Sequence, residues 1–187
     1  MSSFHPSRRR VMLALACGPA GVWAQTTPSI EVAAELPGAK LLGSGRLTFL
    51  TLAIYDARLW VLDGFKAEQF EQTPLAVELE YARTLYGKLI AERSLDEMKR
   101  ASGISDEQAE RWLAVMKQTF PDVAQGDRIT GVFRPGESAR FFLNGKTLGE
   151  VRDAEFARRF FGIWLSPKTS EPKLRAALLG PQGGRAP

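Results

Sequence analysis

Arginine, tyrosine, lysine and carboxylate side chains must do any chemistry of this chain beyond its first 24 residues. The only His and the only Cys, His5 and Cys17, both precede Gln25. Without them the chain has no general base for a Ser-His-Asp or Cys-His nucleophile. A zinc site would have only oxygen ligands, which is unusual, and no glycine-rich phosphate loop precedes a helix. We therefore expect no metal and no cofactor, and either chemistry by these side chains or binding alone.

The segment that holds His5 and Cys17 has the pattern of an export signal. Three arginines in residues 7–10 (SRRR) precede a short apolar run, and residues 22–24 (VWA) form a small-residue cleavage site. The run is far shorter than the roughly 20 residues of a membrane span. We expect removal of residues 1–24 and a periplasmic or secreted protein. The Sec and twin-arginine routes both remain open, and a lipoprotein signal at Cys17 is a weaker alternative.

Little net charge remains after this signal. The whole chain carries a formal charge of +4, and Arg8, Arg9 and Arg10 supply most of it. The remainder has no electrostatic basis for binding nucleic acid, and no later stretch is apolar enough to anchor in a membrane. Residues 25–187 suit one domain. We divide them into a lead-in (25–40), the domain (41–180) and a disordered tail (181–187), and the sequence defines no protein partner.

The first half of the domain is expected to change from strands to helices. Residues 31–36 suggest a short strand, and residues 47–62 form one long strand or two. Residues 75–81 alternate between apolar and charged side chains, which predicts a half-buried strand with Glu78 and Glu80 in solvent. Apolar side chains at helical spacing begin near Tyr86 and end near Gly103. A capping box at Ser105 then begins a second helix, which Pro121 ends.

The second half is expected to be a meander followed by helices. Strands are predicted at residues 128–134, 139–143 and 146–151, with Asn144-Gly145 as the strongest turn signal. Asp153 is predicted to cap one helix and Ser170 to cap the last, which Gly180 ends. This order predicts an α+β fold, in which a large antiparallel sheet packs against a helical layer on one face.

Several short motifs together resemble the bacterial chalcone isomerase-like family. They are FPDV (120–123), GDRI (126–129), RPG (134–136), NG (144–145) and FFGIWLSP (160–167). The resemblance covers roughly residues 41–180 and implies the chalcone isomerase fold, with a cleft between sheet and helices. Relatives with this fold include plant isomerases that close a chalcone to a flavanone, fatty-acid-binding proteins, and proteins without known chemistry.

The resemblance also implies candidate site residues. In the plant enzymes an Arg holds the substrate oxyanion, and a Tyr, a Thr and a water stabilise charge on the ketone. Arg46, which follows a glycine-rich bend, is the best candidate for that Arg, although it is displaced by one position. Tyr86 falls where the catalytic Tyr lies. Leu50 occupies the position of the Thr, with Thr48 and Thr51 as neighbours.

The remaining positions depart further from the catalytic pattern. Arg93 replaces the family's Asn, and no residue matches its last Thr. Trp164 lies among aromatic residues at helical spacing, which are expected to be core and secondarily the wall of an apolar pocket. Tyr55 and Tyr81 are expected to be structural. These departures place flavonoid cyclisation in doubt.

We therefore predict a binding module for a small apolar ligand with an anionic group, such as a fatty acid or an aromatic acid. A guanidinium suits such an anion, so Arg46 is the predicted anchor, with Tyr86 hydrogen-bonding nearby. Arg46 as a plain surface residue is the alternative to that role. Two further functions remain open. One is an isomerase or intramolecular lyase acting on an enone, with Arg46 and Tyr86 as electrostatic catalysts. The other is a non-catalytic module that docks to another protein.

Overall fold

The computed structural model describes residues 27–101 and 103–180. Six antiparallel strands form one sheet, in which the strand order follows the chain. The predicted signal and tail lie outside the described residues. The strands are β1 (Lys40–Phe49), β2 (Leu52–Val61), β3 (Leu75–Tyr81), β4 (Arg128–Arg134), β5 (Ser138–Leu143) and β6 (Lys146–Val151). The helices are α1 (Ile30–Glu35), the 3-10 helix η1 (Ala67–Gln72), α2 (Gly87–Ala101), α3 (Asp106–Thr119), α4 (Ala154–Leu165) and α5 (Pro172–Leu179).

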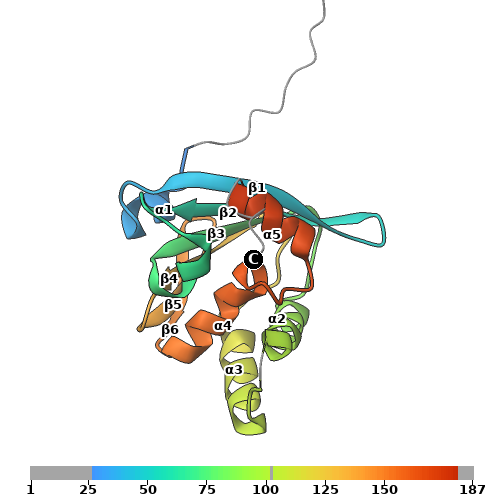
Figure 1. Cartoon of the computed structure of the whole chain (residues 1–187). Coiled ribbons are helices and arrows are strands. Elements are labelled where there is room, and N and C mark those ends of the chain that lie inside the picture. The colour runs from blue at the N-terminus through green and yellow to red at the C-terminus, as the bar shows by residue number, and fades with distance from the viewer. Residues whose placement is uncertain (1–26, 102, 181–187) are drawn as a thin grey trace, which may run out of the picture.

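The fold confirms the predicted α+β plan, including the helical insertion between β3 and β4. The chain leaves the sheet after β3, forms α2 and α3, and returns to β4 directly beside the point of departure (Figure 1). Tyr81 N donates to Asp127 O and Gly126 N donates to Tyr81 O, both at 2.8 Å. A bridge between Leu85 and Val123 closes the neck of this excursion. Within the described residues, no helix has the length and apolar character needed to cross a bilayer.

The main core lies between the sheet and helices α2 to α5. Aromatic side chains from α4 fill much of it, and Phe160 contacts the rings of Phe120, Phe141 and Phe156. Asp153 caps α4 by accepting a hydrogen bond from Phe156 N at 3.0 Å, as predicted. The buried aromatic rings fix α4 against the centre of the sheet, so that its C-terminal turn reaches toward β2.

Two local predictions are confirmed in detail. Ser105 and Gln108 form a reciprocal capping box at the start of α3, with both hydrogen bonds at 3.2 Å. Asn144 and Gly145 both have positive φ, at 49° and 87°, as the two-residue turn between β5 and β6 requires. Both features depend only on neighbouring residues, which is why the sequence pattern identifies them.

The prediction of helices on one face only is wrong, because α1 covers part of the opposite face. The segment predicted as a strand, residues 31–36, lies instead in α1, which ends at Glu35. Val32 and Leu36, four residues apart, pack against Trp60, Ala76, Val132 and Phe142 from the outer face of the sheet. Val32 and Leu36, which are four residues apart, also fit one apolar stripe of a helix. Burial of that stripe against the sheet stabilises the helical conformation of this segment.

The outer face also buries charge, which corrects the prediction that Glu78 lies in solvent. Only 2% of Glu78 is exposed, and its carboxylate accepts a hydrogen bond from the indole N–H of Trp60. Glu31 of α1 accepts hydrogen bonds from Thr130 at 2.7 Å and from Arg128 at 2.9 Å. The strands thus supply hydrogen-bond donors to both carboxylates. Glu78 Oε1 has no hydrogen-bond partner among the described residues and lies 3.6 Å from Arg128 Nε.

The predicted N-cap of α5 is also wrong. Glu171, not Ser170, stands at its N-terminus, and no side chain makes a capping hydrogen bond there. Pro172 occupies the first turn and Gly180 ends the helix, as predicted. A proline at the first helical position already lacks the N–H that a cap would satisfy.

Candidate functional site

A cavity of about 480 Å³ lies between the inner face of the sheet and helices α2, α4 and α5. Strands β1 to β4 supply its floor, and the segment before α5 closes one side. Its apolar lining consists of Leu47, Phe49, Ile54, Leu79, Leu85, Leu89, Ile90, Phe120, Ile129, Phe160, Ile163 and Leu174. A cavity of this size and character suits a small, largely apolar molecule.

Two tyrosines and a tryptophan place hydrogen-bonding groups in this cavity. The Trp164 indole N–H donates to the hydroxyl oxygen of Tyr55 at 3.1 Å, joining α4 to β2. Burial raises the pKa of Tyr55 to about 12, so its hydroxyl keeps its proton at neutral pH. Burial also raises the pKa of Tyr81. Among the described residues, no group hydrogen-bonds the Tyr81 hydroxyl, which leaves it available to a guest.

Charged side chains gather at the α2 side of the cavity. Arg93 and Glu97, one helical turn apart, form an ion pair at 2.6 Å, and Arg100 Nε lies 3.4 Å from the same carboxylate. Glu171 also lines the cavity, and Arg93 is the one cation in its described lining. Because Glu97 is held by two arginines, Arg93 can turn toward a guest anion without leaving that carboxylate unpaired.

The mouth of the cavity lies between the β1–β2 hairpin and α2. Phe49, Leu89 and Arg93 line the cavity and are also exposed, whereas most of the other lining residues are buried or half-buried. Leu89 and Arg93 are four residues apart and share one side of α2. A guest therefore enters past two apolar side chains and one guanidinium.

Comparison with known proteins assigns the family. The family model described as chalcone isomerase-like matches residues 32–180, most of the chain. The chain belongs to the chalcone isomerase-like family. An uncharacterized protein of Haemophilus influenzae is 30% identical over 139 residues, which are 74% of this chain and 67% of that one. The crystal structure of a fatty-acid binding protein of Arabidopsis thaliana superposes with a TM-score of 0.59, at 14% identity. The superposition covers 79% of this chain and 89% of that one, and it shows the shared fold.

Two of the predicted site residues of this chalcone isomerase-like domain line the cavity. Arg93 lies at the mouth, and Trp164 forms part of the wall. Trp164 is thus both core and pocket wall, which joins the two roles that the sequence suggested for it. Tyr55 and Tyr81, expected to be structural, also line the cavity. For Tyr81, the inward alternation of residues 75–81 was the signal that pointed there.

The other predicted site residues lie outside the cavity. Arg46 forms a two-pronged ion pair with Asp56, with both hydrogen bonds at 2.7 Å, on the exposed outer side of the β1–β2 hairpin. Its neighbour Leu47 lines the cavity instead, because successive side chains of a strand point to opposite faces. Thr48 and Thr51 are exposed near the end of the hairpin. Tyr86 is 63% exposed and precedes α2. Arg46 and Tyr86 therefore do not meet in a common cavity, and that expectation is corrected.

The polar groups of the cavity are few. In the described part of the chain, no cluster of three or more His, Cys, Asp or Glu residues could hold a metal ion. The cavity offers two protonated phenols, one guanidinium and two carboxylates. These groups can orient a ligand and hydrogen-bond to it.

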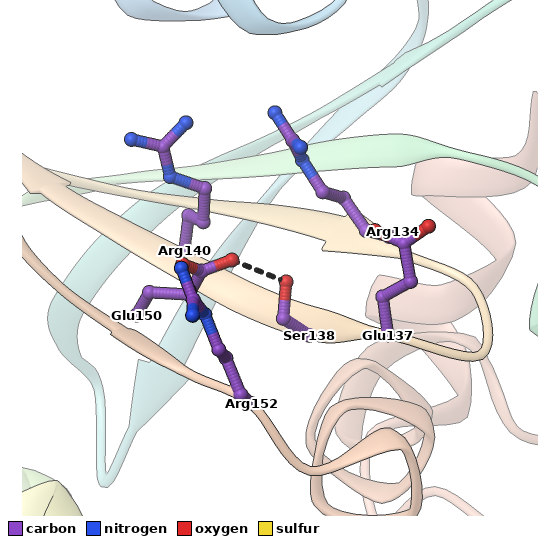
Figure 2. A pocket seen from close by; sticks show the side chains of 6 residues that line it. All are labelled: Arg134, Glu137, Ser138, Arg140, Glu150 and Arg152. Carbon is purple, nitrogen blue, oxygen red and sulfur yellow. Dashed lines mark hydrogen bonds and ion pairs between the residues drawn. The ribbon is translucent and has the colours of Figure 1, made fainter.

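A second hollow, at the other end of the sheet, has a polar lining (Figure 2). It is lined by Arg134, Glu137, Ser138, Arg140, Glu150 and Arg152. Figure 2 shows the Ser138 hydroxyl pointing to Glu150, to which it donates at 2.7 Å. The arginines pair with carboxylates of the chain itself, since Arg134 and Arg140 bind Glu35 and Arg152 binds Glu150. The polar side chains around this hollow therefore connect α1 to β4 and β5, and β5 to β6.

Proposed function

We propose that this chalcone isomerase-like protein binds a small, largely apolar ligand with an anionic group, and holds it in the cavity beneath α2 and α4. The observation that carries the proposal is the cavity itself, which has a volume of about 480 Å³, an apolar lining, the Tyr81 hydroxyl without a described partner, and one guanidinium at the mouth. The Arabidopsis protein with the same fold is, by its title, a fatty-acid binding protein. That likeness supports a ligand with a hydrocarbon chain.

In this proposal the hydrocarbon part lies along the floor of β1 to β4 and the anionic group lies at the mouth. Arg93 binds the anion while Arg100 keeps Glu97 paired. The Tyr81 hydroxyl donates to a polar atom deeper in the cavity. Because Glu97 and Glu171 offset the arginine charge, burial of apolar surface supplies most of the binding free energy. The anionic group then raises the affinity only several-fold over that of an uncharged analogue.

Binding accounts for the geometry better than catalysis on an enone does. The enone hypothesis assigned the charge-stabilising roles to Arg46 and Tyr86. Arg46 is committed to Asp56 on the outer side, and Tyr86 lies outside the cavity. Neither group lines the space between sheet and helices in this arrangement.

The test compares dodecanoate with dodecanol, which differ in the anionic group. We expect both to raise the thermal unfolding midpoint of the full chain, and dodecanoate to bind more tightly by isothermal calorimetry. Arg93→Gln should weaken dodecanoate binding by about fivefold and leave dodecanol binding unchanged. Arg46→Gln is the matched control, because it removes an equally exposed arginine outside the cavity.

Two outcomes would contradict the proposal. If neither compound binds, the cavity does not take a hydrocarbon guest. If both bind and Arg93→Gln alters neither affinity, the anionic group is not recognised at the mouth. Release of a fatty acid or an aromatic acid on solvent extraction of the purified protein would support the proposal independently.

Export is a separate part of the proposal. The basic, apolar and small-residue pattern of residues 1–24 supports it. We expect the protein recovered from the periplasm or the medium of an expressing bacterium to begin at Gln25, as determined by N-terminal sequencing. Recovery of the intact N-terminus from the cytoplasm alone would contradict export.

A further inference from the structure

Exposed apolar side chains gather on the two elements that border the cavity mouth. Six large hydrophobic residues of the described chain are strongly exposed, and all but Ile30 belong to this group. We call it the rim; it consists of Phe49, Leu50, Leu52, Tyr86 and Leu89. Phe49 and Leu89 also line the cavity, so the rim is continuous with the apolar interior.

The hairpin contributes the most prominent part of the rim. Its end extends beyond the helical layer (Figure 1). Residues 47–55 contain no charged side chain. Leu50 and Thr51 form the turn with positive φ, at 46° and 71°, a conformation that favours Asn and Gly. A leucine that is 78% exposed thus occupies a strained turn position, in which its carbonyl oxygen accepts a hydrogen bond from the Thr51 hydroxyl. Such strain is typical of a residue kept for function.

Basic side chains flank the rim. Arg83 follows β3, where Ala82 N donates to Ile54 O at 2.9 Å and so brings this segment beside the start of β2. Lys88 lies in the first turn of α2, next to Leu89. Both are exposed, and neither forms an ion pair with another described residue. Lys88 also interacts electrostatically with Glu92, one helical turn away. Apolar tips beside exposed cations complement an anionic lipid surface, where apolar side chains enter the acyl boundary and cations meet the headgroups.

We propose that the rim docks on a membrane surface containing anionic lipid, with the hairpin end inserted and the cavity mouth facing the bilayer. A hydrocarbon guest would then pass between bilayer and cavity with little exposure to water. Exchange of the guest rests on the proposed function, whereas docking does not. Vesicle binding and ligand binding are therefore measured separately.

The experiment uses the full chain with Cys17→Ser, labelled at Thr51→Cys with an environment-sensitive dye. On phosphatidylcholine vesicles containing phosphatidylglycerol, we expect a blue shift and a gain in intensity. The same dye at Glu137→Cys, in the β4–β5 turn at the opposite end of the sheet, should not respond. Binding through the first 24 residues alone gives no preference for the hairpin, so a response at Thr51→Cys without one at Glu137→Cys assigns the contact to the hairpin.

Substitutions then measure how much the apolar and the basic side chains each contribute to vesicle binding. Leu50→Asn with Leu52→Thr leaves the cavity lining intact and should weaken vesicle binding about tenfold or more. Ile30→Asn is the matched control, because Ile30 is also 78% exposed but lies away from the mouth. Arg83→Gln with Lys88→Gln should weaken binding to anionic vesicles roughly tenfold and leave binding to neutral vesicles unchanged.

Three results would overturn the docking proposal. The first is a dye at Thr51→Cys that does not respond to vesicles. The second is a Leu50→Asn, Leu52→Thr variant that binds vesicles as the parent does. The third is a dye response that rises with protein concentration in the absence of vesicles, together with a dimer in sedimentation, which assigns the rim to a second copy of the chain. Loss of dodecanoate binding with vesicle binding intact would contradict only the proposed function.

Discussion

The indole N–H of Trp164 on α4 donates to the hydroxyl oxygen of Tyr55 on β2 across the wall of the cavity, at 3.1 Å. This hydrogen bond holds the last turn of α4 against the floor of the sheet. Trp164 is buried, and Tyr55 is the acceptor that the described structure gives its N–H. The contact therefore determines both the shape of the cavity and part of the stability of the domain.

Removal of the Tyr55 hydroxyl is expected to destabilise the protein. Tyr55→Phe leaves the Trp164 N–H without an acceptor, and we expect the free energy of unfolding to fall by about 1–2 kcal/mol. Urea denaturation followed by circular dichroism measures the change. Tyr81→Phe is the control, because no described residue hydrogen-bonds the Tyr81 hydroxyl, and it should change stability by less than about 0.5 kcal/mol. Equal effects of the two substitutions would contradict this role of the hydrogen bond.

Two glutamates on the same side of β3 are expected to differ sharply in importance. Glu78→Ala removes the buried acceptor of Trp60 and should lower the free energy of unfolding by about 2–4 kcal/mol. Glu80 binds Arg58 at 2.6 Å but is partly exposed, and Glu80→Ala should cost less than about 1 kcal/mol. Chemical denaturation of both variants under one condition tests the difference. A similar small loss for both would show that Glu78 is not the structural acceptor described here.

Acid is expected to loosen α1 through Glu31. Burial raises the pKa of Glu31, but hydrogen bonds from Thr130, from its own backbone N–H and from Arg128 outweigh burial, so the pKa lies below its ordinary value of 4.5. A depressed pKa in the folded state contributes stability that is present above pH 4.5 and is lost as the pH falls below it. Thr130 and Arg128 lie on β4, so this stability comes from the contact between α1 and the sheet.

Glu31→Gln is the variant that isolates this titration. We expect it to be less stable than the parent near neutral pH and to lose less stability between about pH 5 and pH 3. Urea midpoints across that range give the slope. Glu137→Gln, a change at an exposed turn, serves as the control and should retain the slope of the parent. An unchanged slope in Glu31→Gln would assign the acid sensitivity to other carboxylates.

Much of the fold could be predicted because its signals are local. The capping box at Ser105 and the turn at Asn144 involve only residues close together in the chain. The alternation of residues 75–81 correctly predicted which side chains point inward. The family resemblance supplied the overall arrangement, which the match over residues 32–180 confirms. The failure at α1 has a physical reason: a short segment carries too few apolar positions to separate a period of 2 from a period of 3.6.

The site could be predicted only in part, because lining a cavity depends on strand phase and on contacts distant in sequence. Arg46 was chosen for its residue type and its place in the family pattern. A shift of one position in a strand moves a side chain to the opposite face, and the displacement of Arg46 by one residue has that result. Trp164 follows from the helical spacing of aromatic residues that face the core, whereas Arg93 is a candidate only because it stands at the position of the family's Asn. The burial of Glu78 could not be seen, since α1 and Trp60 approach it from distant parts of the chain.

The excursion between β3 and β4 has a mechanical consequence. The chain leaves at Tyr81 and returns at Arg128, while β3 and β4 pair with each other directly. Outward movement of α2 and α3 about the Leu85–Val123 bridge therefore separates packed side chains but breaks no strand pairing. The strand pairing of the cavity floor is therefore independent of the position of α2, which forms one part of the roof beside α4 and α5.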